Sequence, residues 1–476
     1  MGASSAPMTK PAPDRAARAR KLLEGPILLT LLGLAAPNFA VMIAQTAASF
    51  AESYYVGLLG TEALAGAALV FPLFMLMQMM SAGGMGGGIS SAVARAVGGG
   101  RLHDAEALVL HAVVIAIGFG LTFSAAALLG GPALYRAMGG RGAALEAAIA
   151  YSNTVFLGAT LLWLLNSLAN VLRGSGNMVL PAQVLGGGGI AVILLAPLLM
   201  FGWGPLPGFG IVGAAAALVA FHGVGSLVLL LSLLRGNGLV RLSLAHRLQW
   251  RHFAEILRVG MFGVASTLVS NLAVAMATGL VGLHGAAALA GYGLGARMEY
   301  LQIPIAFSFG SALVAMVGMN VGAGKRRRAL LAAWAGSLAV AGFTAAIGIA
   351  AALFPREWLG LFTADPAVVA AGAEYFTIVG PAYAFFGMGM AMYFAAQGTG
   401  RMAWPLAAGV VRLAIIAGAG WVAAHILDLG LAGTYGVIAL ALVVFGAINA
   451  APWLLRLFDP AWTGNRVDPP LQNAAR

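Results

Sequence analysis

The feature that most constrains this chain is a series of about twelve long apolar segments that follow one another along almost its whole length. Each is about 20 residues or longer, which is enough for a helix to cross the ~30 Å hydrocarbon core of a bilayer. Within that core every backbone N–H and C=O must be paired inside the segment, so such runs specify helices. We therefore predict an all-α membrane protein with about twelve transmembrane helices. The expected spans are 27–53, 62–88, 106–131, 145–171, 180–203, 210–234, 256–282, 286–318, 329–354, 369–396, 402–427 and 431–455.

The composition agrees with a membrane protein and excludes several kinds of site. Only 9% of the residues are charged and 61% are hydrophobic, whereas a soluble chain of this length needs far more charge on its surface. The chain has no cysteine, which excludes disulfides, thiolate metal sites and cysteine nucleophiles. Its 67 glycines suit close packing between membrane helices. We expect no metal and no cofactor.

The basic residues predict how the chain is oriented. If the N-terminus is cytoplasmic, 21 of the 26 Lys and Arg residues fall in cytoplasmic segments. Only Arg136, Arg141 and Arg356 fall on the other side, and Arg297 and Arg412 lie inside spans. This bias follows the positive-inside rule. It predicts a multi-pass protein of the inner (plasma) membrane with both termini cytoplasmic, and it explains the net charge of +11 without a nucleic-acid partner.

The two halves of the sequence resemble each other at offsets of 224 or 225 residues. Four matches in the same order indicate a duplicated unit of six helices. An even number of helices gives both halves the same orientation, as in transporters whose substrate sites lie at the interface of parallel repeats or inside a lobe. The matches are VGLLGTEALAG at 56–66 with VGLHGAAALAG at 281–291, VGGGR at 97–101 with VGAGK at 321–325, Tyr151 with Tyr375, and RGSGNMVLP at 173–181 with QGTGRMAWP at 397–405.

The repeat divides the chain into two lobes. The glycine-rich segments 98–100 and 322–324 follow no strand, and no Walker-type Gly-Lys-Ser/Thr sequence follows them, so we interpret them as tight turns between helices. The linker is basic and partly amphipathic, and it is either a helix lying on the membrane surface or an ordinary loop. The expected parts are a disordered cytoplasmic tail over 1–25, an N lobe over 26–234, a basic cytoplasmic linker over 235–255, a C lobe over 256–457 and a cytoplasmic tail over 458–476.

Several segments, taken in order, resemble the multidrug and toxic compound extrusion (MATE) family of the multidrug/oligosaccharidyl-lipid/polysaccharide flippase superfamily. The resemblance covers residues 25–455. It implies two six-helix bundles around a V-shaped central cavity, a monomer, and export of organic, often cationic, compounds in exchange for protons or sodium ions. The segments are AAPNFAVMIAQTAASFAESYYVGLLGTEALAG from residue 35, RGSGNMVLP from 173, MVGMNVGAGKRRRA from 316, LFTADPAVVAAGAEYF from 361 and YFAAQGTGRMAWP from 393.

Glu52 is the first candidate for ion coupling. A carboxyl group inside a span is a functional hypothesis by default, because an unpaired charge in hydrocarbon is unfavourable. Pro37 removes a backbone hydrogen bond from the same span and is a candidate hinge, and Gln45 lies two helical turns before Glu52 on the same face, as a candidate cavity residue. The first span resembles the DinF-like branch of the family, which has an aspartate where Glu52 stands and so implies a proton-binding carboxylate. The alternative is that Glu52 is only the polar end of a helix.

Glu299 is the second candidate for proton or cation coupling. Arg297 lies two residues away and cannot face it on a helix, so we treat Arg297 as a candidate cavity residue. The competing interpretation is a structural ion pair between Glu299 and an arginine of another helix, such as Arg412. Pro304 follows in the same span and is a second candidate hinge.

Amides supply the remaining candidates for the substrate cavity. Asn166 and Asn170 share one face of a helix, and Asn271 lies in the seventh span. The alternative for this pair is hydrogen bonding that only holds helices together. The sequence departs from the DinF-like branch at Ala196, where that branch has an aspartate before a proline, which puts a two-carboxylate site in the N lobe in doubt.

The function that fits these features is a secondary antiporter that exports small organic compounds by alternating access. A single N-lobe carboxylate favours protons, because a sodium site usually needs several oxygen ligands. The alternative is a flippase for a lipid-linked saccharide or another amphipathic molecule, which would be expected to need more cations in the cavity. We expect no enzymatic activity, because no nucleophile–base pair or aspartate cluster lies within the spans. A channel fits a two-lobed duplication less well. The partners expected are the small-molecule substrates and the lipid bilayer.

Overall fold

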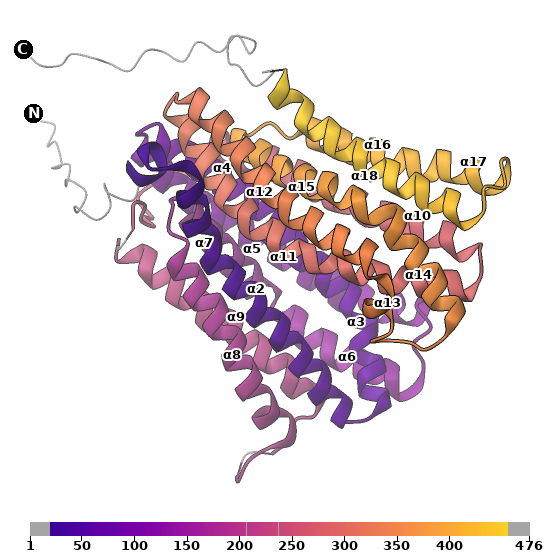
Figure 1. Ribbon diagram of the computed structural model, residues 1–476. Coiled ribbons are helices and arrows are strands. Elements are labelled where there is room, and N and C mark those ends of the chain that lie inside the picture. Colours follow the sequence, from indigo (N-terminus) through magenta and orange to yellow (C-terminus); the bar gives the residue numbers. More distant parts are fainter. Residues whose placement is uncertain (1–19, 206, 237, 456–476) are drawn as a thin grey trace, which may run out of the picture.

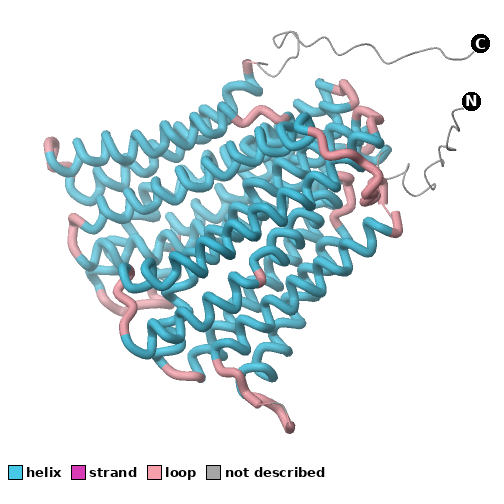
Figure 2. The backbone as a smooth tube through the Cα atoms, turned by 180° about the vertical axis from the view of Figure 1, so that it is seen from behind, coloured by secondary structure: helices cyan, strands magenta, loops and turns pink. Residues whose placement is uncertain are grey.

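The computed structural model describes residues 20–455, apart from 206 and 237, and within these residues the chain forms helices and connecting loops without a β-strand (Figure 2). Eleven helical segments are long and apolar enough to cross a membrane. Twelve are obtained when α6 and α7, which meet at a bend of 46°, are counted as one span. The protein is therefore an all-helical, multi-pass membrane protein, as predicted.

The helices divide into two lobes that match the two halves of the repeat (Figure 1). The N lobe consists of α2 (Ile27–Leu58), α3 (Thr61–Met79), η1 (Met80–Met85), α4 (Gly86–Gly98), α5 (Leu102–Ala137), α6 (Gly142–Leu157), α7 (Ala159–Gly174), α8 (Val179–Phe201) and α9 (Ile211–Leu234). The C lobe consists of α10 (Trp250–Gly282), α11 (Ala286–Gly322), α12 (Arg326–Leu353), α13 (Pro355–Leu359), α14 (Pro366–Val379), η2 (Gly380–Ala382), α15 (Tyr383–Thr399), α16 (Ala403–Ala414), η3 (Ile415–Ala419), α17 (Gly420–His425) and α18 (Gly430–Leu454).

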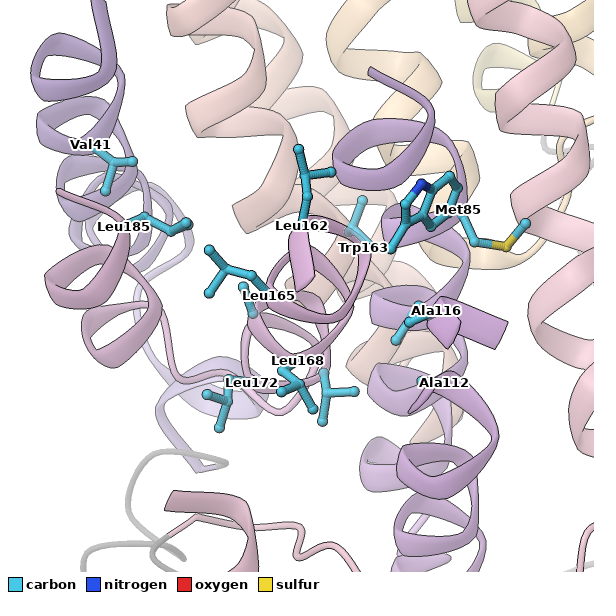
Figure 3. Close-up of a cluster of buried hydrophobic side chains, with 14 of the residues drawn as sticks. Val41, Met85, Ala112, Ala116, Leu162, Trp163, Leu165, Leu168, Leu172 and Leu185 are labelled. Atoms are coloured by element: carbon cyan, nitrogen blue, oxygen red, sulfur yellow. The ribbon is translucent and has the colours of Figure 1, made fainter. Parts of the chain in front are cut away.

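The N lobe is built around large apolar side chains from several helices (Figure 3). Trp163 of α7 is fully buried and stacks on Phe119 of α5, with 4.9 Å between the ring centroids. Val41 of α2 and Leu185 of α8 lie in the same cluster and attach α2 to the rest of the lobe. In a membrane such packing comes from close van der Waals contact, because lipid is as apolar as the side chains.

The N half of the repeat has one inserted residue, and the insertion coincides with a π-helical turn. The offset between matched residues is 225 at residue 66 and 224 at residue 97, so the N half has one extra residue between them. In this interval the N lobe has the π-helical segment η1, whereas the matching helix α11 is α-helical over its whole length. A π turn holds one residue more than an α turn, which accommodates the insertion without breaking the helix.

The molecule has two ends, which we call the linker end and the far end. The linker end carries residue 20, the linker after α9, the turns at 98–101 and 322–325, and residue 455 (Figure 1). Both turns contain a glycine with a positive φ, +72° at Gly100 and +71° at Gly324, a conformation that other residues rarely adopt. The far end carries the loops after α2, α5 and α8. It also carries the segment before Pro366, where α14 begins.

Two sequence predictions about segments need correction. Residues 20–24 form a short helix, and Leu22 is buried against Gly176, so this part of the expected disordered tail is ordered. Of the two interpretations of the linker, the ordinary loop applies up to Gln249, and the predicted end of the linker needs correction because 250–255 already belong to α10. Residues 1–19 and the expected C-terminal tail over 458–476 lie outside the described residues.

The lobes meet at the linker end through glycines. A Cβ atom at Gly88 of α4 would lie 2.7 Å from the backbone of Gly260 in α10, and one at Gly84 would lie 2.9 Å from the backbone of Val264. Only residues without side chains allow backbones to approach this closely. Within the run GGMGGG at 83–88, Gly84, Gly87 and Gly88 therefore form the surface that the C lobe contacts, whereas Gly86 faces Asn170 of the N lobe.

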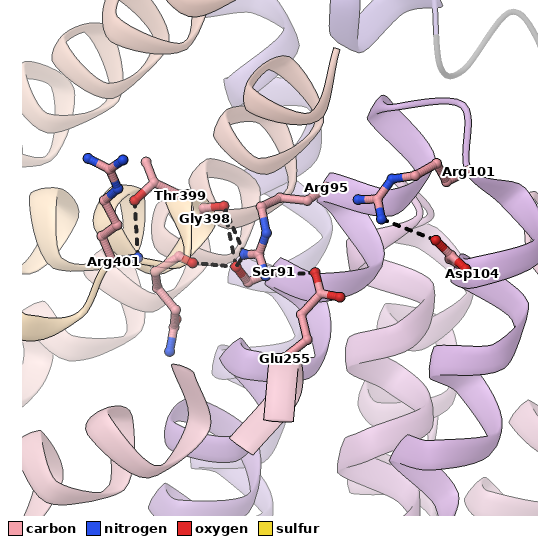
Figure 4. Close-up of polar contacts among 9 residues, drawn as sticks. Ser91, Arg95, Arg101, Asp104, Glu255, Gly398, Thr399 and Arg401 are labelled. Carbon is pink, nitrogen blue, oxygen red and sulfur yellow. Dashed lines mark hydrogen bonds and ion pairs between the residues drawn. The ribbon is translucent and has the colours of Figure 1, made fainter. Parts of the chain in front are cut away.

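Polar contacts join the lobes beside these glycines (Figure 4). Arg95 of α4 donates to Glu255 of α10 at 3.1 Å and to the Gly398 carbonyl of α15 at 3.5 Å. The Ser91 hydroxyl accepts a hydrogen bond from Arg95 and donates to the Gln397 carbonyl. Farther along, Asn38 of α2 donates to the Ser311 hydroxyl of α11 at 2.8 Å. These contacts hold the linker end closed.

Candidate functional site

Glu52 lies in the far half of α2 and is held by a tyrosine. The Tyr151 hydroxyl of α6 donates a hydrogen bond of 2.6 Å to Oε1 of Glu52. Tyr151 is buried with 7% of its surface exposed, whereas Glu52 is half-buried. Glu52 thus remains accessible while one of its oxygens is fixed in position.

Among the described residues, Glu52 forms no ion pair, and its hydrogen bond comes from Tyr151. A carboxyl group in this setting is favoured when it is neutral, because its negative charge has only the Tyr151 hydroxyl to stabilise it. A proton or a cationic ligand supplies the missing positive charge.

Glu299 occupies a comparable setting in the C lobe. It accepts a hydrogen bond from the Tyr375 hydroxyl of α14, and Tyr383 of α15 donates to the Tyr375 hydroxyl at 3.3 Å. Tyr375 is the repeat counterpart of Tyr151, at an offset of 224. The two lobes thus use equivalent tyrosines to hold carboxylates that come from non-equivalent helices, α2 and α11.

The two carboxylates differ in their charged neighbours. Arg412 of α16 acts electrostatically on Glu299, although no direct ion pair between them lies within 4 Å. The Arg412 guanidinium lies 5.7 Å from the ring centroid of Phe386 and 5.8 Å from that of Phe445, and its Nε atom has no hydrogen-bond partner. Glu299 therefore has a cationic side chain in its surroundings, although the two groups form no direct ion pair.

The two N-lobe amides expected in the cavity belong to α7 and hydrogen-bond to residues at the π turn η1. Asn166 donates to the Ser81 hydroxyl at 2.8 Å and to Oε1 of Gln78 at 3.0 Å. Asn170 donates to the Ala82 carbonyl at 3.3 Å. Both asparagines are buried, and neither contacts Glu52. These bonds satisfy polar groups around η1, which agrees with the interpretation that the amides hold helices together.

The other candidates occupy separate places. Asn271 is exposed and donates to the Thr267 carbonyl of its own helix at 2.8 Å. Arg297 is exposed, and its guanidinium lies 5.5 Å from the ring of Phe362 rather than beside Glu299. Gln45 is half-buried on α2, and Ala196 is buried in α8 without a carboxyl group. The structure therefore does not bring all the predicted cavity residues into one site.

The candidate hinges lie within continuous helices. Pro37 lies inside α2 and Pro304 lies inside α11, and neither ends its helix. Asn38, next to Pro37, and Ser308, one turn after Pro304, donate to carbonyls of the preceding turn. Each bond goes to the carbonyl four residues before its own donor, so neither reaches the carbonyl four residues before the proline, which is the one that the proline leaves without a backbone donor.

Sequence reasoning missed the two tyrosines as functional residues. Tyr151 and Tyr375 stood out as a matched pair in the repeat, so a signal was present. Their partners were not visible, because Tyr151 contacts a residue 99 positions away and Tyr375 one 76 positions away. Because the partners are so far apart in the chain, these contacts depend on how the helices pack and not on a local sequence pattern.

Comparison with known proteins identifies relatives over most of the chain. The MatE family model matches residues 37–198 and 261–420. An FAD transporter from Shewanella oneidensis is 27% identical over 77% of this chain and 81% of its own length. A probable multidrug resistance protein NorM from Thermotoga maritima is 26% identical over 79% of this chain and 81% of its own length. The solved structure of a MOP superfamily transporter from Pyrococcus furiosus shares the fold, with a TM-score of 0.82 at 24% identity over 94% of this chain and 99% of that one.

Proposed function

Since the chain belongs to the MatE family, we propose that it is an antiporter that exports small organic, often cationic, compounds in exchange for protons. Its relatives include probable multidrug resistance proteins, which supports a role in drug export. The proposed location is the inner (plasma) membrane with the linker end in the cytoplasm. This orientation follows from the basic residues that gather at the linker end, such as Lys325 to Arg328.

The observation that carries the proposal is the setting of Glu52. A protonated Glu52 is neutral and keeps its hydrogen bond from Tyr151, which requires no other cation. An ionised Glu52 attracts a positively charged substrate into the same site. Proton and substrate then compete for one carboxylate, and this competition is sufficient for antiport.

We assign the structure to the state of the transport cycle in which the linker end is closed. With the Arg95–Glu255 pair formed and the glycine surfaces in contact, passage from the cytoplasm is blocked. In this state the proposed site exchanges its cation with the outside. A second state, in which these contacts break and the far halves close, would take substrate from the cytoplasm.

Transport in proteoliposomes tests the proposal. An imposed proton gradient is expected to drive export of a fluorescent organic cation such as ethidium, and a sodium gradient is not. Glu52→Gln should abolish proton-driven export without loss of folded protein, since glutamine cannot bind the proton. Glu62→Gln is the matched control, because Glu62 is exposed in the first turn of α3. Normal transport by Glu52→Gln would refute the role of Glu52 and make Glu299 the next carboxylate to test.

A second candidate substrate class is suggested by the relative named FAD transporter, and the same transport assay can test it. FAD is an anionic dinucleotide, and the protein has buried guanidinium groups at Arg173 and Arg412. Arg173 lies 5.9 Å from the ring of Phe307, across the boundary between the lobes. Export of FAD that depends on Arg173 but not on Glu52 would favour this alternative, and a lipid-linked saccharide would be tested in the same way.

A further inference from the structure

Four of the seven histidines gather at one place on the linker end. His103 and His111 come from α5, His246 from the linker and His252 from the first turn of α10. The rings form two pairs, with centroid distances of 4.6 Å between His103 and His246 and 4.9 Å between His111 and His252. Histidine is the side chain that titrates between pH 5 and 8, so this cluster is equipped to respond to pH.

His111 must be uncharged in this structure. Its Nε2 atom accepts a hydrogen bond of 2.9 Å from the backbone N–H of Gln249, while Nδ1 lies 2.7 Å from the Ala107 carbonyl and so carries the proton. Gln249 immediately precedes α10, so this bond attaches the start of α10 and the end of the linker to α5. A proton on Nε2 would remove the acceptor and leave two N–H groups facing each other.

The charged groups around the histidine cluster do not favour a protonated His111. Asp104 of α5 is paired with Arg101 and Arg251, both at 3.1 Å, and lies 3.7 Å from His252. Glu106 of α5 is paired with Arg241 of the linker at 3.1 Å and lies 3.6 Å from His246. Glu255 of α10 is paired with Arg95 of α4. Asp104 and Glu106 lie within 4 Å of His252 and His246, but each is already engaged by an arginine. His111 has no carboxylate within ion-pair distance among the described residues, so a proton on His111 adds positive charge without a partner.

We propose that this histidine cluster is a pH-sensitive latch, in which protonation of His111 releases the start of α10 and the linker from α5. Lost hydrogen bonding at Gln249 and repulsion within the His111–His252 pair act in the same direction. In the orientation proposed above, the latch senses the pH of the cytoplasm. The latch itself does not depend on which substrate is exported or on Glu52, because no residue of the cluster contacts that site.

Hydrogen–deuterium exchange on the full chain in nanodiscs tests the latch. After correction for the intrinsic pH dependence of exchange, peptides that contain Gln249 should exchange about tenfold faster at pH 5.5 than at pH 7.5, as expected for loss of one partly buried hydrogen bond. His111→Gln keeps a neutral acceptor and should remove the acid response. His111→Ala lacks the acceptor and should exchange fast at both pH values.

His425→Gln is the matched control, because His425 lies at the far end in α17, and its acid response should equal that of the unmodified protein. His252→Gln removes one member of the charged pair and should reduce the response without abolishing it. Equal protection of Gln249 at both pH values in the unmodified protein would overturn the proposal. A full acid response in His111→Gln would also overturn it, since the titrating group would then lie elsewhere.

Discussion

Glu255→Gln should loosen the closed linker end by a measurable amount. In the structure Glu255 accepts from Arg95 at 3.1 Å, and the two side chains are 29% and 15% exposed, so water screens the pair only partly. A hydrogen bond to a charged group contributes ~1.5–3 kcal/mol, about twice as much as a neutral one. Glutamine keeps a neutral acceptor, so the change should cost about 1.4 kcal/mol, or about tenfold in the population of the closed state.

Cysteine modification can measure this shift, because the chain has no cysteine of its own. Met319 of α11 is fully buried against Gly98 of the other lobe and provides the reporter position as Met319→Cys. Maleimide should modify this cysteine about tenfold faster when Glu255→Gln is also present. Leu244→Cys in the linker is 80% exposed and should react at the same rate in both backgrounds.

A second pair of variants separates the ion pair from general damage. Arg95→Gln alone loses the bonds to Ser91 and Gly398 as well as Glu255, so it should accelerate modification more than Glu255→Gln does. Once Arg95 is replaced, adding Glu255→Gln should have little further effect. Equal modification of Met319→Cys with and without Glu255→Gln would show that the pair does not hold the lobes together.

Two further changes test other parts of the structure. Tyr151→Phe removes the hydroxyl that donates to Glu52 and should lower proton-driven export about tenfold without lowering the amount of protein in the membrane; unchanged export across pH 6 to 8 would contradict its role in positioning Glu52. Gly88→Ala places a methyl group 2.7 Å from the Gly260 backbone and should also speed maleimide reaction at Met319→Cys, whereas Gly118→Ala has no atom within 4 Å and should not; equal rates would argue against the glycine contact.

The sequence was sufficient for the spans and the two-lobed fold. Apolar runs such as 27–58 are long, and glycines and arginines interrupt them at the turns, so length and charge alone define each crossing. The turns at Gly100 and Gly324 were also predictable, because positive φ favours glycine. Both features are local, which is why one sequence reveals them.

The candidate site was only half visible in the sequence. A lone carboxyl group in an apolar span identified Glu52, but its partner depended on how α2 and α6 pack, which no local pattern specifies. The pair Asn166 and Asn170 was correctly placed on one helix face, yet that face meets the π turn rather than Glu52. The change of offset between the repeats shows that one residue is inserted in this interval. Only the structure shows that the insertion forms a π-helical turn.

The glycine surface between the lobes has a consequence for the energetics of the transport cycle. A carrier works only if its two states have similar free energies, because a ligand shifts their populations by no more than its difference in affinity for them. Interlocked side chains would favour one state by many contacts and would have to reorder at every turnover. Backbone resting on backbone at Gly84 and Gly88 separates without any change of rotamer, so a few polar contacts such as Arg95–Glu255 are left to set the balance.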